Sequence, residues 1–181
     1  MTPQIICKNR KDKWIQYKDP VHLFSTSCLS EVLPLLNKTE SYVESEKLHA
    51  VGFISYEAAS AFDSALTASA DPDFPLIWFG LYHQSQPVEI RHNNKIPLIL
   101  EPGIDHTTYI DHILKIKEYI RSGDTYQVNY TYPMRSVFDA DPQALFWKLA
   151  LAQPTPYTMF IETDDWAVCS VSPELFFSLE K

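Results

Sequence analysis

The hydrophobic period of this chain changes several times between that of a strand and that of a helix, which constrains it to a mixed fold. The continuous apolar run 50–56 is the first clear strand, and the Ala-rich residues 57–66 after it favour a helix. A second apolar, aromatic strand is predicted at 76–82, and Pro97 makes residues 96–100 an edge strand or an irregular one. Strands and helices therefore alternate along the first half of the sequence.

A helical period begins at Thr107 and ends at Gly123, a residue that commonly terminates helices. Thr108 and Asp111 have the spacing of a capping box. An apolar stripe follows this helix, and such a stripe is typical of a helix packed on a core; it consists of Tyr109, Ile113, Ile116 and Ile120. The stripe is informative about fold and not about function.

Residues 125–132 show the strictest alternation in the chain, because apolar Tyr126, Val128, Tyr130 and Tyr132 are interleaved with polar residues. Asp141 and Pro142 predict the start of a helix to Ala152. A hairpin is expected from 157–162 and 166–171, with a further strand at 174–179. These elements predict an α+β fold of antiparallel sheets with flanking helices.

The charge of the chain argues against nucleic acid as a partner, since the net charge is -8 and the pI about 5.1. Four basic residues near the start (Lys8, Arg10, Lys11 and Lys13) are not followed by an apolar run, so they do not indicate a signal peptide. No segment is long and apolar enough to span a bilayer. We therefore expect a cytoplasmic protein that has no membrane or nucleic-acid partner.

Sequence patterns for cofactor or metal sites are missing. No glycine-rich phosphate loop is present, and the chain has only four glycines. The six histidines lack ligand spacing, and the three cysteines are too widely spaced for a zinc site. Asp164 and Asp165 are interpreted as turn formers rather than as metal ligands. We assign no metal-binding residue.

The polar face of residues 125–131 has two interpretations. Thr125, Gln127, Asn129 and Thr131 would either line a cleft for a carboxylated ligand or form the solvent-facing side of a half-exposed sheet. Periodicity does not decide between these alternatives.

Three ordered motifs give the chain a resemblance to a known family. Residues 120–131 are similar to its I-x-x-G-D-x-Y-Q-V-N-x-T segment, residues 153–157 resemble the N-P-S-P-Y segment of anthranilate synthases, and residues 171–177 give the third motif. Residues 51–59 and 75–82 are similar to the N-terminal region of the aminodeoxychorismate branch. The chain thus resembles the N-terminal part of aminodeoxychorismate synthase component I, in the anthranilate synthase component I superfamily.

The resemblance implies an enzyme that replaces the C4 hydroxyl of chorismate with ammonia, towards 4-aminobenzoate and folate. It implies Mg²⁺ as cofactor of the complete enzyme and a glutamine amidotransferase subunit as the partner that delivers ammonia. It also implies helices stacked outside two packed antiparallel sheets. Residues 1–104 would be the N-terminal region, and 105–181 the beginning of the chorismate-binding region.

The catalytic groups of the family, namely the lysine of Pro-Ile-Lys-Gly-Thr, the Mg²⁺-binding glutamates and the carboxylate-binding arginine, have no counterpart in this sequence. We therefore assign no catalytic residue and expect the chain alone to be inactive, with no metal bound. Its status as an enzyme stays open. The alternatives are a non-catalytic module that binds a ligand or docks an amidotransferase, or a fragment of anthranilate synthase component I. A C-terminal complementary chain is a further candidate partner.

Two segments resemble the family's tryptophan pocket, and they supply the candidate ligand-binding residues Ser25, Pro154, Pro156 and Tyr157. Phe24 stands where the Leu-Leu-Glu-Ser motif has its acid, which would weaken recognition of the ligand's ammonium group. The alternative for residues 154–157 is a rigid, proline-bounded turn that enters a strand. If both segments keep their places, they should lie close together.

Overall fold

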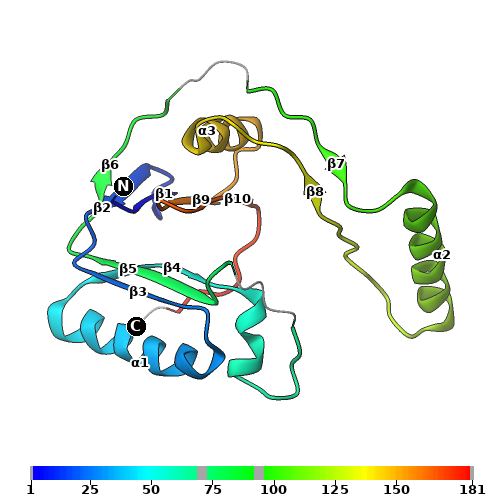
Figure 1. The fold of residues 1–181 in the computed structure, drawn as a ribbon, viewed down its shortest axis with the longest axis horizontal. Coiled ribbons are helices and arrows are strands. Elements are labelled where there is room, and N and C mark those ends of the chain that lie inside the picture. Colours follow the sequence, from blue (N-terminus) through cyan, green and yellow to red (C-terminus); the bar gives the residue numbers. More distant parts are fainter. Residues whose placement is uncertain (1, 69–72, 92–95, 180–181) are drawn as a thin grey trace. The chain divides into compact units, whose positions relative to one another are not determined.

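The computed structural model describes residues 2–68, 73–91 and 96–179. The chain divides into two compact units: unit 1 comprises Met1–Asn93 and Asp141–Lys181, and unit 2 comprises Asn94–Ala140 (Figure 1). The family boundary expected between 104 and 105 stays a prediction. No helix in the described part of the chain has the length and apolarity needed to cross a membrane.

Unit 1 contains two antiparallel sheets. The larger has the strand order β10-β9-β1-β2-β6 and the smaller the order β3-β5-β4. The strands are β1 (Gln4–Lys8), β2 (Trp14–Lys18), β3 (His22–Thr26), β4 (His49–Ile54), β5 (Ile77–Tyr82), β6 (Gln86–Pro87), β9 (Tyr157–Glu162) and β10 (Ala167–Ser172). Strand β1 lies between β2 and β9, so the two ends of the sequence meet in one sheet.

The core between the sheets is built from alternate residues of the facing strands. Ile5, Tyr17 and Ile161 of the larger sheet pack with Trp78 and Tyr82 of the smaller one, and all five are buried. Successive side chains of a strand point to opposite faces. The residues that alternate with these core residues therefore lie on the outer faces of the two sheets. Each sheet therefore has two buried sides.

Helices occupy both outer faces (Figure 1). Helix α3 (Pro142–Ala152) buries Phe146 and Trp147 against Ile6 and Phe160 of the larger sheet. Helix α1 (Leu29–Glu46) packs against the smaller sheet, where Val32 joins a buried cluster with the Ala58, Leu76 and Ile77 side chains. The expected α+β fold of antiparallel sheets with helices outside them is confirmed.

Local sequence accounts for the start of α3 and the end of α2 (His106–Ser122). The Asp141 side chain caps α3 by accepting a hydrogen bond from the Gln143 backbone N–H at 3.0 Å. In unit 2, α2 ends at Gly123, whose φ of 85° lies in the left-handed region. The cap of α2 differs from the expected box: Asp105 accepts from the Thr108 backbone N–H at 2.7 Å.

Several elements of unit 1 differ from the expectations. The helix expected at 57–66 is the short 3₁₀ helix η1 (Tyr56–Ala61). Residues 174–179 form no strand in the described part of the chain, although their period suggested one. Strands β1 to β3 and helix α1 were not expected.

Unit 2 has little regular structure besides α2. Its two short strands β7 (Glu101–Pro102) and β8 (Met134–Arg135) pair with each other. No strand forms within the described residues 125–132, so the prediction of a strand there is wrong. The edge or irregular strand predicted at 96–100 is also absent, since the described residues 96–100 form no strand. Unit 2 therefore lacks the sheet for which its alternating sequence is suited.

Candidate functional site

Strand β3 places Ser25 on the inner face of the smaller sheet. Ser25 lies directly opposite Trp78 in the antiparallel register, and directly opposed residues point to the same face. Trp78 belongs to the core between the two sheets, yet the Ser25 side chain is exposed. Ser25 is therefore accessible at the edge of the space between the sheets.

Phe24 points the other way. It is opposite Phe79, which contacts the cluster under α1, and its ring lies 5.6 Å from the ring of Tyr42 on that helix. The Lys38 Nζ lies 4.9 Å from the centre of the Phe24 ring. Phe24 thus packs on α1 instead of standing on the face that carries Ser25.

The segment Pro154–Tyr157 forms a closed turn between α3 and β9. Thr155 is buried, and its hydroxyl lies 2.8 Å from that of Thr158. The Thr158 hydroxyl also donates to the Thr155 carbonyl at 3.0 Å. Together with the prolines on both sides of Thr155, these hydrogen bonds hold the turn in one conformation. The Thr155 hydroxyl is engaged in a hydrogen bond within the turn. The backbone of residues 154–157 is therefore described by the alternative interpretation, a rigid turn bounded by prolines.

Pro156 and Tyr157 line a cavity of about 430 Å³ at one end of the larger sheet. The other lining residues are Lys8, Asn9, Arg10, Asp12, Leu175 and Ser178. Lys8 Nζ lies 2.7 Å from Asp12 Oδ1, and Asn9 Oδ1 accepts hydrogen bonds from the backbone N–H groups of Lys11 and Lys13. A fixed hairpin turn thus brings cationic side chains beside a phenol, an arrangement compatible with a small anion that has an apolar body.

The structure brings Pro156 and Tyr157 to one cavity but does not bring Ser25 to it. Ser25 is on β3 in the other sheet, and Pro154 is an exposed residue that precedes the cavity wall. Convergence of these segments on one ligand stays a prediction. Sequence reasoning missed the β1–β2 turn as part of the cavity, although the cluster of basic residues there was a visible signal.

Tyr82 is a second feature that the sequence did not reveal. Its side chain is on the same face of β5 as Trp78, and it is 1% exposed. The hydroxyl has no hydrogen-bond partner among the described residues. Burial, followed by the negative charge of Asp19, raises the pKa of Tyr82, so the phenol stays protonated. It is a hydrogen-bond donor in the core beside β3.

The polar residues 125–131 do not form the expected strand face. Thr125 donates from its hydroxyl to the Gln127 carbonyl at 3.0 Å, and Gln127 Nε2 donates to Asn129 Oδ1 at 3.2 Å. Gln127, Asn129 and Thr131 are exposed. In this structure Thr125, Gln127 and Asn129 bond to one another along the chain instead of forming one face of a strand.

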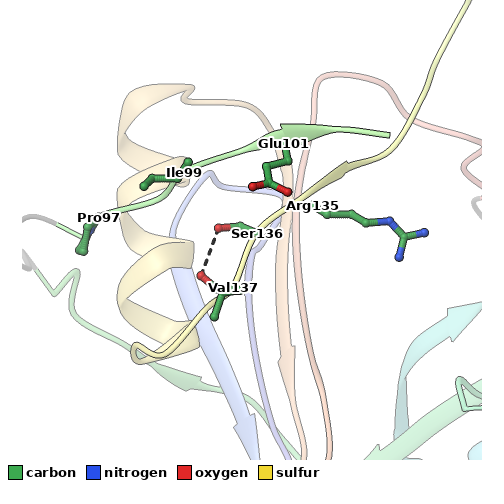
Figure 2. Close-up of a pocket in the computed structure, with 6 residues that line it drawn as sticks. All are labelled: Pro97, Ile99, Glu101, Arg135, Ser136 and Val137. Carbon is green, nitrogen blue, oxygen red and sulfur yellow. Dashed lines mark hydrogen bonds between the residues drawn. The ribbon is translucent and has the colours of Figure 1, made fainter. Parts of the chain in front are cut away.

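Unit 2 has a cavity of its own, of about 460 Å³, beside the β7–β8 pair. Glu101 and Arg135 are opposite each other in the register, but Figure 2 shows the Arg135 side chain extending away from Glu101. Pro97, Ile99 and Val137 give the cavity an apolar wall, and the Ser136 hydroxyl donates to the Val137 carbonyl at 3.1 Å. The exposed side chains make this an open surface hollow with one acid and one base.

Metal-ligating and nucleophilic side chains are the remaining candidates for chemistry. Among the described residues, no group of three or more His, Cys, Asp or Glu side chains could hold a metal ion. Burial raises the pKa of the Cys7 thiol to about 11. Burial, with the charge of Glu162, raises the pKa of Cys169 to about 11 as well. Both half-buried thiols are therefore protonated near neutral pH and are poor nucleophiles.

Comparison with known proteins decides the family. A family model described as chorismate binding enzyme matches residues 3–181. The chain belongs to the family of chorismate-binding enzymes. This agrees with the three motifs and with the sandwich of unit 1.

Similar chorismate-binding enzymes come from both branches of the family. Aminodeoxychorismate synthase component 1 of Salmonella typhimurium is 25% identical over 190 residues, which cover 90% of this chain and 41% of that protein. The Bacillus subtilis protein of the same name is 38% identical over 64 residues, covering 35% of the chain and 14% of the relative. Anthranilate synthase component 1 of Saccharolobus solfataricus is 29% identical over 80 residues, covering 44% and 19%. The chain spans about two-fifths of the length of the Salmonella relative.

Proposed function

We propose that this chain is the N-terminal part of an aminodeoxychorismate synthase component I. The complete enzyme would convert chorismate and ammonia to 4-amino-4-deoxychorismate, for 4-aminobenzoate and folate synthesis in the cytoplasm. The observation that carries the proposal is the match over 90% of the chain to a relative of that name, together with the Tyr-Gln-Val-Asn wording of residues 126–129. A glutamine amidotransferase subunit would supply the ammonia.

In this proposal the chain contributes fold and ligand surface, while the chemistry comes from elsewhere in the complete enzyme. The sequence has no Pro-Ile-Lys-Gly-Thr segment, and the described residues hold no group of three or more His, Cys, Asp or Glu side chains that could bind a metal ion. Bound Mg²⁺ would offset carboxylate charge and help the hydroxyl to leave. Unit 1 would hold the rest of the fold in place and would provide the amidotransferase with a rigid surface.

The product of a hybrid enzyme tests this function. The chain is substituted for the matched region of the Salmonella relative, and the hybrid is incubated with chorismate, ammonium and Mg²⁺. We expect 4-amino-4-deoxychorismate, identified by mass spectrometry and by its conversion to 4-aminobenzoate with an added lyase. Turnover that is lost in this hybrid but kept when the chain replaces the matched region of the Saccharolobus anthranilate synthase component 1 would assign the chain to the other branch and would refute the proposal.

We also propose that Ser25, Pro154, Pro156 and Tyr157 are remnants of a tryptophan-type ligand site. Tryptophan binding by the isolated chain should be weak or undetectable, because the side chains that β3 presents on the Ser25 face are Leu23 and Ser25, neither of them acidic. Loss of a charge-assisted hydrogen bond to the ammonium costs about 1.5–3 kcal/mol, roughly tenfold or more in affinity.

Calorimetric titration of the folded chain with tryptophan is the measurement, and Tyr157→Ala is the control variant. Sub-micromolar affinity for tryptophan would contradict the expectation of weak binding. If the Tyr157→Ala variant binds tryptophan with the same affinity as the unchanged chain, Tyr157 is not part of the site.

A further inference from the structure

Lys8 places a largely buried positive charge in the wall of the cavity that Pro156 and Tyr157 also line. The Lys8 side chain is 11% exposed, and its Nζ lies 5.3 Å from the centre of the Trp14 ring. Lys8 and Trp14 are opposite each other where β1 and β2 pair, so both side chains lie on one face of the sheet. An ammonium group withdrawn from water in this way needs an acceptor, and a carboxylate is a strong one.

Asp12 supplies such a carboxylate from within the chain. Its Oδ1 lies 2.7 Å from Lys8 Nζ, yet the Asp12 side chain is 74% exposed. Asp12 is at the tip of the β1–β2 turn and has a φ of 57°, a left-handed conformation that Asp adopts more readily than most residues. An ion pair with one exposed partner is weak, because water competes for the exposed group. The carboxylate of Asp12 is therefore replaceable by that of a ligand.

The wall of the cavity also has an apolar part. Pro156, Tyr157 and Leu175 supply it, and the side chains of Tyr157 and Leu175 are 41% and 46% exposed. Both residues therefore have surface left for contact with a ligand. The volume of about 430 Å³ falls within the range of about 300–1,000 Å³ that is usual for small-molecule sites. A flat ring is the ligand body that best fits an aromatic wall of this kind.

The charges of the lining residues favour an anion. Lys8 and Arg10 are cationic, and Asp12 is the one acid among the described residues that line the cavity. This local excess of positive charge contrasts with the net charge of -8 of the whole chain. An ammonium group on a ligand would be repelled by both cations and would meet an acid that is already bound to Lys8.

We propose that this cavity binds a small carboxylate with a flat apolar body and no ammonium group, and that Asp12 competes with the ligand for Lys8. The inference rests on the proposed function only in treating Pro156 and Tyr157 as ligand-binding residues. The ligand differs from tryptophan in charge, since tryptophan carries an ammonium group. Because Asp12 is an internal competitor, removal of its charge should strengthen binding.

Benzoate and its neutral counterpart benzamide test the preference for an anion. The isotope-labelled chain is titrated with each compound at neutral pH and low ionic strength, and binding is followed by the NMR signals of the backbone amides. Benzoate should bind about tenfold more tightly than benzamide, because only benzoate forms a charge-assisted hydrogen bond. The signals that shift should be those of residues 8–13 and of Tyr157, which surround the cavity.

Substitutions in the β1–β2 turn separate the roles of its charges. Asp12→Asn should strengthen benzoate binding by about threefold or more. Lys8→Met should abolish the preference for benzoate over benzamide, and Lys8→Arg, which keeps the charge, should retain it. The matched control is Lys13→Gln, which removes an equal charge from an exposed residue that does not line the cavity. It should change the affinity by less than about twofold. If Lys8→Met does not fold, Asp12→Asn still tests the competition.

Four results would overturn the proposal. Equal affinity for benzoate and benzamide would show that the charge of the ligand is not recognised. Benzoate that shifts amide signals elsewhere would place its site outside this cavity. Unchanged affinity in Asp12→Asn would contradict the competition, and inorganic phosphate that binds as tightly as benzoate would contradict the role of the apolar wall. Because binding is measured without turnover, these results leave the proposed reaction standing, and a hybrid enzyme that lacks the expected product leaves this site standing.

Discussion

Replacement of Phe160 by alanine is expected to lower the free energy of unfolding by about 3–5 kcal/mol. Phe160 is fully buried in the centre of the larger sheet, where β9 pairs with β1 on one side and β10 on the other. Its ring stacks on Phe146 of α3 with the ring centres 5.2 Å apart. Truncation would leave a cavity between sheet and helix, and single domains are stable by only about 5–15 kcal/mol.

Urea denaturation followed by tryptophan fluorescence measures this effect, because Trp14 and Trp147 lie in the same cluster as Phe160. The control is Phe176→Ala, which removes the same side chain from a position that is 95% exposed. It should change the free energy of unfolding by less than about 0.5 kcal/mol. Equal effects of the two substitutions would contradict the packing of α3 on this sheet.

Replacement of Gly52 by alanine should destabilise unit 1 by about 3 kcal/mol or more. Gly52 is in β4 opposite Phe79, and an added Cβ would collide with the Trp78 carbonyl oxygen and lie 2.8 Å from the Phe79 Cα. Both obstacles are backbone, so the neighbouring strand must move. On conformational entropy alone the substitution would stabilise a strand by roughly 0.5–1 kcal/mol, and the collision reverses that sign.

The control for this substitution is Gly123→Ala. Gly123 has a φ of 85°, but no atom lies within 4 Å of its added Cβ, so only backbone strain of about 1 kcal/mol is introduced. Gly123 is in unit 2, whereas all four tryptophans are in unit 1. The tryptophan-detected unfolding transition should therefore stay in place for Gly123→Ala and shift strongly for Gly52→Ala. A stable Gly52→Ala protein would show that β4 and β5 are farther apart than the structure places them.

Local pattern predicted the elements whose signals are complete within a few residues. Strand β5, helix α3 and the β9–β10 hairpin follow from continuous apolar runs, an Asp-Pro start and a polar turn. Helix α2 ended at Gly123 as expected for a glycine that accepts a positive φ. The hydrophobic period of each of these elements is visible in its own residues, without knowledge of the elements that pack against it.

The elements that were missed depend on distant partners. Strands β1 and β2 are five residues long, and each contains charged or amide side chains. Strand β1 is stabilised by pairing with β9, more than a hundred residues away, and β2 pairs with β1 and β6. Helix α1 contains Pro34 and many Ser, Thr and Glu residues, and only Val32 and Thr39 are buried. Tertiary packing compensates there for a weak local preference.

The error at 125–132 has the opposite cause. Its alternation is the clearest strand signal in the sequence, but a strand needs a neighbour, and the described residues provide none. The same limit applies to the candidate site: the alternation of β3 places Ser25 and Phe24 on opposite faces, and the motif comparison could not show this. Motifs identified the family, and register determined which side chains share a face.

Turnover by the isolated chain tests the central claim most directly, namely that this part of a chorismate-binding enzyme carries fold and ligand surface without the chemistry. Purified chain is incubated with chorismate, ammonium and Mg²⁺, and products are separated and quantified by mass. The account predicts no 4-amino-4-deoxychorismate or anthranilate above the enzyme-free control. Product that forms in proportion to the chain and requires Mg²⁺ would contradict it, because groups within these 181 residues would then perform the reaction.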